Sequence, residues 1–183
     1  MTRIRSLVCA ALALWPILAA SQPSDYVASK VQAFSVAGPL TCCGGATTET
    51  NIANIRIPGG SMGPTGAIEL KCLWTYPNSA NNKTLTVRFN PTSGTTAGGV
   101  LHGTFSVTTS ALTQTVIIIR NTAVNSQVFW PLTPVTPFGN NPGGIGTLAL
   151  DTTADTYLNI NAITASGAET ITLNHCIALV MRP

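Results

Sequence analysis

Apolar and polar residues alternate with a period of two along much of this chain, a pattern typical of β-strands with one buried face. In residues 66–76 one face collects apolar and aromatic side chains: Ile68, Leu70, Cys72, Trp74 and Tyr76. Similar alternation recurs in residues 84–89, 101–107, 158–162 and 171–179. After residue 38 no segment has a convincing helical period. The sequence therefore predicts an all-β chain.

Turn signals separate these segments, among them Pro58-Gly59-Gly60, Pro77-Asn78-Ser79 and the glycine-rich residues 92–99 and 139–146. A chain of 183 residues suits one buried core rather than two. Short strands at regular spacing favour a sandwich or a barrel, and roughly eight to ten of them suit a jelly roll. We predict an antiparallel two-sheet, jelly-roll-like sandwich with an extended or helical N-terminal arm.

The alternation also predicts which side chains fill the core. We expect the following residues to be largely buried: Leu70, Cys72, Trp74, Leu85, Val87, Phe89, Phe105, Val107, Ile118, Leu158, Ile160, Leu173 and Ile177. Residues 116–119 are continuously apolar, as in a strand that is covered on both faces. His175 falls on the apolar face of the last strand, where a core or interface histidine is expected.

The N-terminus has the marks of a secretory signal: a basic start, an apolar stretch over residues 7–20 and small residues near Ala20. The stretch is short and contains Pro16, which makes it a poor membrane span. If it is retained, it needs a surface that covers it. We expect residues 1–39 to be a retained arm lying on a neighbouring subunit, and residues 40–183 to form the jelly-roll domain.

Five cysteines leave at least one thiol unpaired within a monomer. Cys42 and Cys43 are adjacent, so a bond between them is not expected to form easily, and no C-x-x-C pair is present. Cys72 and Cys176 lie in strand-like segments, where buried free thiols are common. We favour free thiols in a core, and the pairing of these four cysteines stays open.

Two motifs give the chain a resemblance to a known family. They are Ile57-Pro58-Gly59-Gly60-Ser61-Met62-Gly63-Pro64-Thr65-Gly66 and Asn78-Ser79-Ala80-Asn81-Asn82-Lys83-Thr84-Leu85-Thr86-Val87-Arg88-Phe89. They resemble an SMGPNG-like turn and an NSANxKTLxVRF segment in a module of structural proteins of tailed bacteriophage particles.

The resemblance continues at residues 119–121, 151–154 and 167–173 and covers about residues 52–181. It does not extend to the apolar N-terminus or to residues 42–45. In physical terms the motifs are structural: glycines permit turns, asparagines bond to loop backbone, Lys83 starts a strand and Arg88 lies on its outer face.

The sequence contains fragments of catalytic and metal-binding motifs, but none of them is complete. Residues 59–63 match G-x-S-x-G around Ser61, with Asp151, Asp155 and His175 following, but Pro64 and Gly66 exclude the helix that a nucleophile elbow needs. Two facing carboxylates of a glycosidase, a calcium loop at Asp151 and Asp155, and a histidine metal site all lack supporting spacing. We therefore expect no enzyme activity, catalytic residue, cofactor or metal.

Charged residues make up 8% of the chain and hydrophobic residues 45%, which suits a protein covered by neighbours. The net charge of +3 is too small and too scattered for nucleic acid, and no membrane partner is expected. The resemblance implies a phage virion protein, for which we expect a capsid decoration or cement (head-fibre type) subunit. We expect it to be a homotrimer that binds the major capsid protein or other virion proteins through the arm.

Two alternatives remain open. One is a tail or baseplate component of the same kind of particle. The other, of a different class, is a secreted or cell-surface carbohydrate-binding jelly roll, with a sugar-stacking platform formed from Trp74, Tyr76, Trp130 and Phe138.

Overall fold

The computed structural model describes residues 30–44, 47–96, 100–132 and 145–182. Strands form all of the regular structure in these residues, as the alternation predicts. Their bounds are β1 Lys30–Cys42, β2 Thr50–Ile57, β3 Ala67–Thr75, β4 Lys83–Asn90, β5 Val100–Val107, β6 Leu112–Ala123, β7 Ser126–Leu132, β8 Gly146–Leu148, β9 Thr156–Thr164 and β10 Ile171–Arg182.

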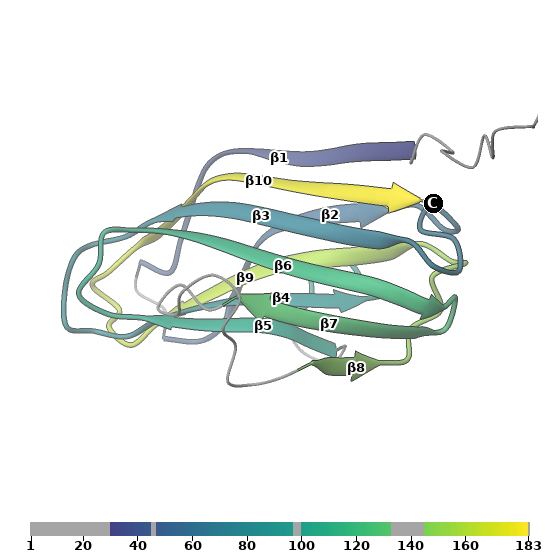
Figure 1. The fold of residues 1–183 in the computed structure, drawn as a ribbon. Helices are drawn as coiled ribbons and strands as arrows, with labels where there is room; N and C mark the ends of the chain where they lie inside the picture. The colour runs from purple at the N-terminus through teal and green to yellow at the C-terminus, as the bar shows by residue number, and fades with distance from the viewer. Residues whose placement is uncertain (1–29, 45–46, 97–99, 133–144, 183) are drawn as a thin grey trace, which may run out of the picture.

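The strands form two antiparallel sheets that pack face to face (Figure 1). The six-stranded sheet has the order β1-β10-β3-β6-β7-β8, and the four-stranded sheet has the order β2-β9-β4-β5. The pairs β1·β10, β2·β9, β3·β6 and β4·β5 are nested, so the chain resembles one long hairpin rolled across both sheets. This is the jelly-roll topology, with β7 and β8 extending one edge. The predicted fold class is confirmed.

The core between the sheets contains most of the residues that the alternation selects. Leu70, Cys72, Trp74, Leu85, Val87, Phe89, Val107, Leu158, Ile160 and Leu173 are all buried. The side chain of Phe105 lies outside the described part of the chain. Trp74 is fully buried, and its indole nitrogen donates to Thr115 Oγ1 at 3.1 Å, which satisfies its one polar atom.

Two predicted core residues lie on the wrong face. In β6 the buried residues are Ile117 and Ile119, so Ile118 points outward and is only partly buried. In β10 the register shifts between Leu173 and His175, which turns Cys176 inward and leaves Ile177 partly exposed. The same shift places His175 outside the core, so the core position predicted for it is wrong, whereas the interface position stays a prediction.

The expected boundary between arm and domain falls inside a strand. Residues 30–39 belong to β1, which pairs with β10 and forms an edge of the six-stranded sheet. Phe34 and Val36 pack against the core, so this part of the predicted arm is part of the sandwich. The predicted boundary is therefore too late by about one strand. The apolar stretch of residues 7–20 lies outside the described residues.

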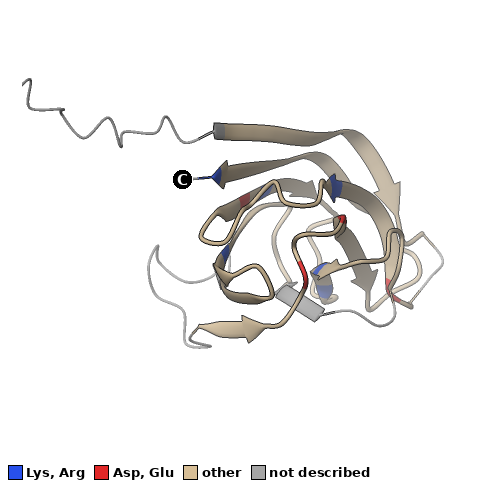
Figure 2. Cartoon of the chain, turned by 90° about the vertical axis from the view of Figure 1, so that its right-hand side faces the viewer, with Lys and Arg blue, Asp and Glu red and all other residues tan. Residues whose placement is uncertain are grey.

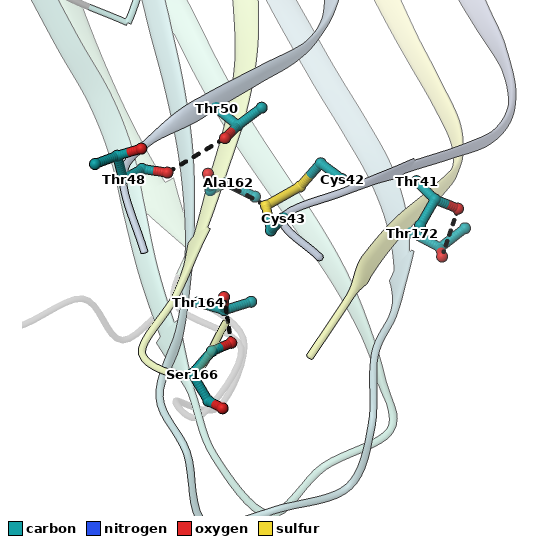
Figure 3. The surroundings of a disulfide bond; sticks show 9 residues. All are labelled: Thr41, Cys42, Cys43, Thr48, Thr50, Ala162, Thr164, Ser166 and Thr172. Carbon is teal, nitrogen blue, oxygen red and sulfur yellow. Dashed lines mark hydrogen bonds between the residues drawn. A yellow bond between two sulfur atoms is a disulfide. The ribbon is translucent and has the colours of Figure 1, made fainter. Parts of the chain in front are cut away.

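The structure contains two disulfides where free thiols were favoured. Cys72 on β3 and Cys176 on β10 are bonded across two neighbouring strands, 104 residues apart in sequence. Cys42 and Cys43, predicted not to bond readily, are joined to each other at the end of β1 (Figure 3). The β10 register, which faces Cys176 to Cys72, is the information that the sequence pattern lacked.

The outer faces of the two sheets differ in chemistry. On the six-stranded sheet, partly exposed apolar side chains point outward: Ile177, Leu179, Met181, Val116, Ile118 and Trp130. We call these six residues the apolar outer face. On the four-stranded sheet, asparagine, threonine and arginine side chains point outward instead. The few charged residues are scattered over the molecule (Figure 2).

Candidate functional site

The motifs that resemble phage modules meet at the two ends of the roll. At one end, the β3–β4 loop contacts the β9–β10 loop around Lys83. The Lys83 ammonium is fully buried and donates to Ser79 Oγ at 2.7 Å. It lies 3.5 Å from Glu169 Oε2 and 5.8 Å from the centre of the Tyr76 ring. Asn81 donates to the other oxygen of Glu169 at 3.0 Å.

In this cluster the buried ammonium group of Lys83 is paired with the carboxylate of Glu169. Hydrogen bonds from Ser79 and then Asn81, together with the charge of Lys83, hold the pKa of Glu169 below its usual value. Lys83 was correctly predicted to start a strand, but no local pattern indicates its carboxylate partner Glu169, which is 86 positions away. Separating the two loops would leave a buried ion unpaired, which is costly, so the cluster holds the loops together.

At the other end, Asn121 holds the glycine-rich turn between β2 and β3. Its amide nitrogen donates to the Gly63 carbonyl at 2.6 Å and to Thr152 Oγ1 at 2.8 Å. Gly63 has a φ of +63°, and a Cβ on Gly66 would collide with the carbonyl of Met62. The motif residues 63–66, 121 and 152 therefore fix a close approach of two loops to the end of β6. Only glycine meets both backbone requirements.

An exposed ion pair completes this end. Arg56 donates to Asp155 Oδ2 at 2.9 Å through Nε and at 2.6 Å through a terminal nitrogen. The backbone N–H of Gly59 donates to Asp155 Oδ1 at 3.0 Å. The Gly59 hydrogen bond, followed by that of Arg56, lowers the pKa of Asp155. This carboxylate is therefore committed to anchoring the turn.

The outer face of the four-stranded sheet carries a polar network that the sequence analysis missed. Arg88 on β4 forms two hydrogen bonds to Glu49, at 3.0 and 2.8 Å, and Asn161 on β9 donates to Glu49 Oε1 at 2.8 Å. The predicted outward position of Arg88 is confirmed. The hydrogen bond from Arg88 lowers the pKa of Glu49, although desolvation acts in the opposite direction.

The β4–β5 loop lies over this network. Asn159 and Asn161 alternate with inward Leu158 and Ile160 yet are fully buried. Gly94 donates to Asn159 Oδ1 at 2.7 Å, and Asn159 donates to the Thr92 carbonyl at 2.9 Å. The asparagines at alternate positions of β9 were the sequence signal from which this network could have been predicted. Each amide has both donors and an acceptor, so together they fasten the loop to the sheet.

A groove of about 800 Å³ lies beside the G-x-S-x-G turn, between Phe34 and Gln32 of β1, residues 58–61 and Arg182. Ser61 Oγ is buried there without a hydrogen-bond partner. The turn's backbone N–H groups are engaged within the protein: Gly60 donates to Thr152, Ser61 to Pro58 and Gly63 to Gly60. They form no cradle for an oxyanion.

The hydrolase partners of Ser61 do not assemble around it. The turn lies beside Arg182 at the end of β10, whereas His175 is seven residues earlier on the same strand. At about 3.3 Å per residue that separation is roughly 23 Å. Asp151 accepts hydrogen bonds from Thr153, which lower its pKa, and does not meet the serine. A nucleophile–base contact requires about 3 Å.

The aromatic residues considered for sugar stacking are dispersed. Trp74 and Tyr76 are buried, and the Tyr76 hydroxyl bonds to Thr113 Oγ1. Trp130 is partly exposed on β7, on the apolar outer face. Phe138 lies outside the described residues. Trp74 and Tyr76 therefore do not contribute to a stacking platform.

Among the described residues no group of three or more His, Cys, Asp or Glu side chains is placed to hold a metal ion. In the same part of the chain there is no helix long and apolar enough to cross a membrane.

Comparison with known proteins yields little. No protein-family model matches the sequence, and no curated protein matches it. A chain in the structure of infectious bursal disease virus, Gx strain, is similar at 11% identity and a TM-score of 0.31. The match covers 83% of this chain and 40% of the viral chain, so this chain spans less than half the length of that neighbour. A similarity this slight supports no statement about function, and the resemblance to tailed-phage modules stays a prediction.

Proposed function

We propose that this chain is a structural protein of a virus particle, and more specifically a capsid decoration or cement subunit of a phage. The observation that carries the proposal is the structural role of the motif residues. The residues on which the resemblance to phage modules rests include Lys83, Asn121 and the turn 58–66, and they hold the loop ends of a jelly roll together rather than forming a reactive group. Jelly rolls recur in capsid and lectin domains.

The surface chemistry also supports this proposal. A protein with 8% charged residues and an apolar outer sheet face is poorly suited to an isolated existence in water. Covering by neighbours removes that disadvantage. We propose a homotrimer bound to the capsid, where repeated contacts across capsomer boundaries add strength to the shell even when each is weak.

Localisation of the chain in purified particles tests the proposal directly. Particles lacking it should release their DNA at a lower temperature than complete particles. If these particles keep full heat resistance but fail to adsorb to cells, the tail or baseplate function replaces decoration. Absence of the chain from purified particles would overturn both.

The carbohydrate-binding alternative loses the support of Trp74 and Tyr76, because both are in the core. No observation on the described residues favours it over a virion role, and we do not propose it.

A further inference from the structure

The apolar outer face spans four neighbouring strands, with Glu69 and Lys71 of β3 between the apolar residues of β10 and those of β6 and β7. The registers place Leu179 beside Glu69, Glu69 beside Ile118, and Ile118 beside Trp130. One rung along, Ile177 lies beside Lys71 and Lys71 beside Val116. An antiparallel sheet with one face in solvent normally presents polar side chains there. This sheet presents apolar residues on both faces.

We infer that three copies of this chain pack around one axis through the apolar outer face, so that one part of the face on each copy contacts a different part of the face on the next. The inference rests on the proposed homotrimer and adds the surface by which it forms. Three copies around one axis can each turn this face inward. The occupant is then a surface of matching apolar character, supplied by the chain itself.

The charges in this face are arranged for self-association. Glu69 and Lys71 are neighbours on the outward side of β3 and are 2.9 Å apart. They place one positive and one negative charge at the centre of the apolar surface. Within one copy they pair with each other, and in a closed ring Glu69 of one copy can also meet Lys71 of the next, so that both charges stay paired when the surface is covered.

The face also has the shape and size for a partner. A hollow of about 260 Å³, lined by Leu73, Ile177, Lys71, Gln114 and His175, opens on it and can accept an apolar side chain. The four strands and the four outward rungs from Met181 to His175 cover on the order of 500 Å² at ordinary strand spacings. That is more than half of the roughly 800 Å² per partner of a standard specific interface.

Charge substitutions on matched faces test this inference. Leu179→Glu places a charge at the centre of the apolar outer face. Ala33→Glu places one on the exposed edge strand beside Leu179, where folding tolerates it. The matched control is Thr84→Glu, which adds the same charge to a partly exposed outward position of β4 in the other sheet. Circular dichroism verifies folding, and light scattering at micromolar concentration gives the stoichiometry.

We expect wild type and Thr84→Glu to be trimers, and both Leu179→Glu and Ala33→Glu to weaken association by roughly a hundredfold or more. If all three variants keep the wild-type stoichiometry, or wild type is monomeric, the inference is wrong. Incorporation into particles is scored separately. A wild-type trimer that is absent from particles refutes the virion role alone, whereas a particle-bound monomer refutes the packing face alone.

Discussion

The two sheets of this jelly roll differ in what covers their outer faces. The four-stranded sheet covers its outer face with the chain's own β4–β5 loop, which is fastened to Asn159 and Asn161 by hydrogen bonds. The six-stranded sheet leaves Leu179, Ile118 and Trp130 partly exposed. Hydrogen bonds supply directional, local closure, whereas an apolar surface accepts any partner of matching shape. One face is completed within the chain, and the other is left for association.

The largest expected effect is the difference in stability between substitutions on the inner and on the outer apolar face of the six-stranded sheet. Trp74→Ala should lower the free energy of unfolding by about 3–5 kcal/mol, because the ring fills the core. Trp130→Ala on the outer face is the matched control, with a loss of about 1 kcal/mol or less in the monomer. Urea denaturation measures both losses, at a protein concentration low enough that the protein is monomeric. Equal losses would show that the outer face is also core.

A second test addresses the polar face. Arg88→Ala should cost about 1–3 kcal/mol, because it leaves the partly buried Glu49 carboxylate without its positive partner and with only the hydrogen bond from Asn161. Arg56→Ala removes the more exposed pair with Asp155 on the same sheet and should cost no more than about 1 kcal/mol. Thermal unfolding ranks the two. If Arg56 matters more, the loop does not shield the network.

The pH dependence of stability gives a further test of the same network. The pKa of Glu49 is lowered by Arg88 in the folded state, so the unfolded state binds more protons in acid. The stability that Glu49 contributes is therefore complete above its ordinary pKa of 4.5 and is lost as the pH falls through the lowered value. In acid, the free energy of unfolding of Glu49→Gln should fall less steeply with decreasing pH than that of wild type. An unchanged slope would contradict the assignment.

The smallest expected effect is on the apolar face. Lys71→Gln removes a pair whose side chains are 40% and 25% exposed, so the monomer should lose under about 1 kcal/mol. Its effect should appear in trimer dissociation at low salt and should diminish as salt rises. Sedimentation at two ionic strengths measures this, with Lys71→Arg retaining the charge.

The same contrast explains how far the sequence could predict the structure. Alternation identified the all-β class and the inward residues of β3, β4 and β9, because those strands have faces of different polarity. It failed at Ile118 because residues 116–119 are apolar on both faces. It failed at Ile177 because the register shift in β10 has no sequence signature. A strand with two apolar faces contains no information about which one is inside.

The candidate site followed the same rule. The sequence identified the turn 58–66 and the segment 78–89, because glycine, proline and asparagine have local backbone preferences. It could not identify the partners of Lys83 and Arg88, since Glu169 and Glu49 are brought close only by the roll. The Cys72–Cys176 bond was missed for the same reason. Long-range pairing is a property of topology, which local patterns do not encode.

The nesting of β1 against β10 also fixes the order of events during synthesis. The first described strand pairs with the last, so the roll cannot close until β10 has left the ribosome. Chains dominated by such distant pairings fold slowly, over milliseconds to seconds. Ile177, Leu179 and Met181 lie on β10, whereas Val116, Ile118 and Trp130 lie on β6 and β7. The two halves of the apolar outer face are therefore joined into one surface only when β10 pairs with β3, after the rest of the roll has been synthesised.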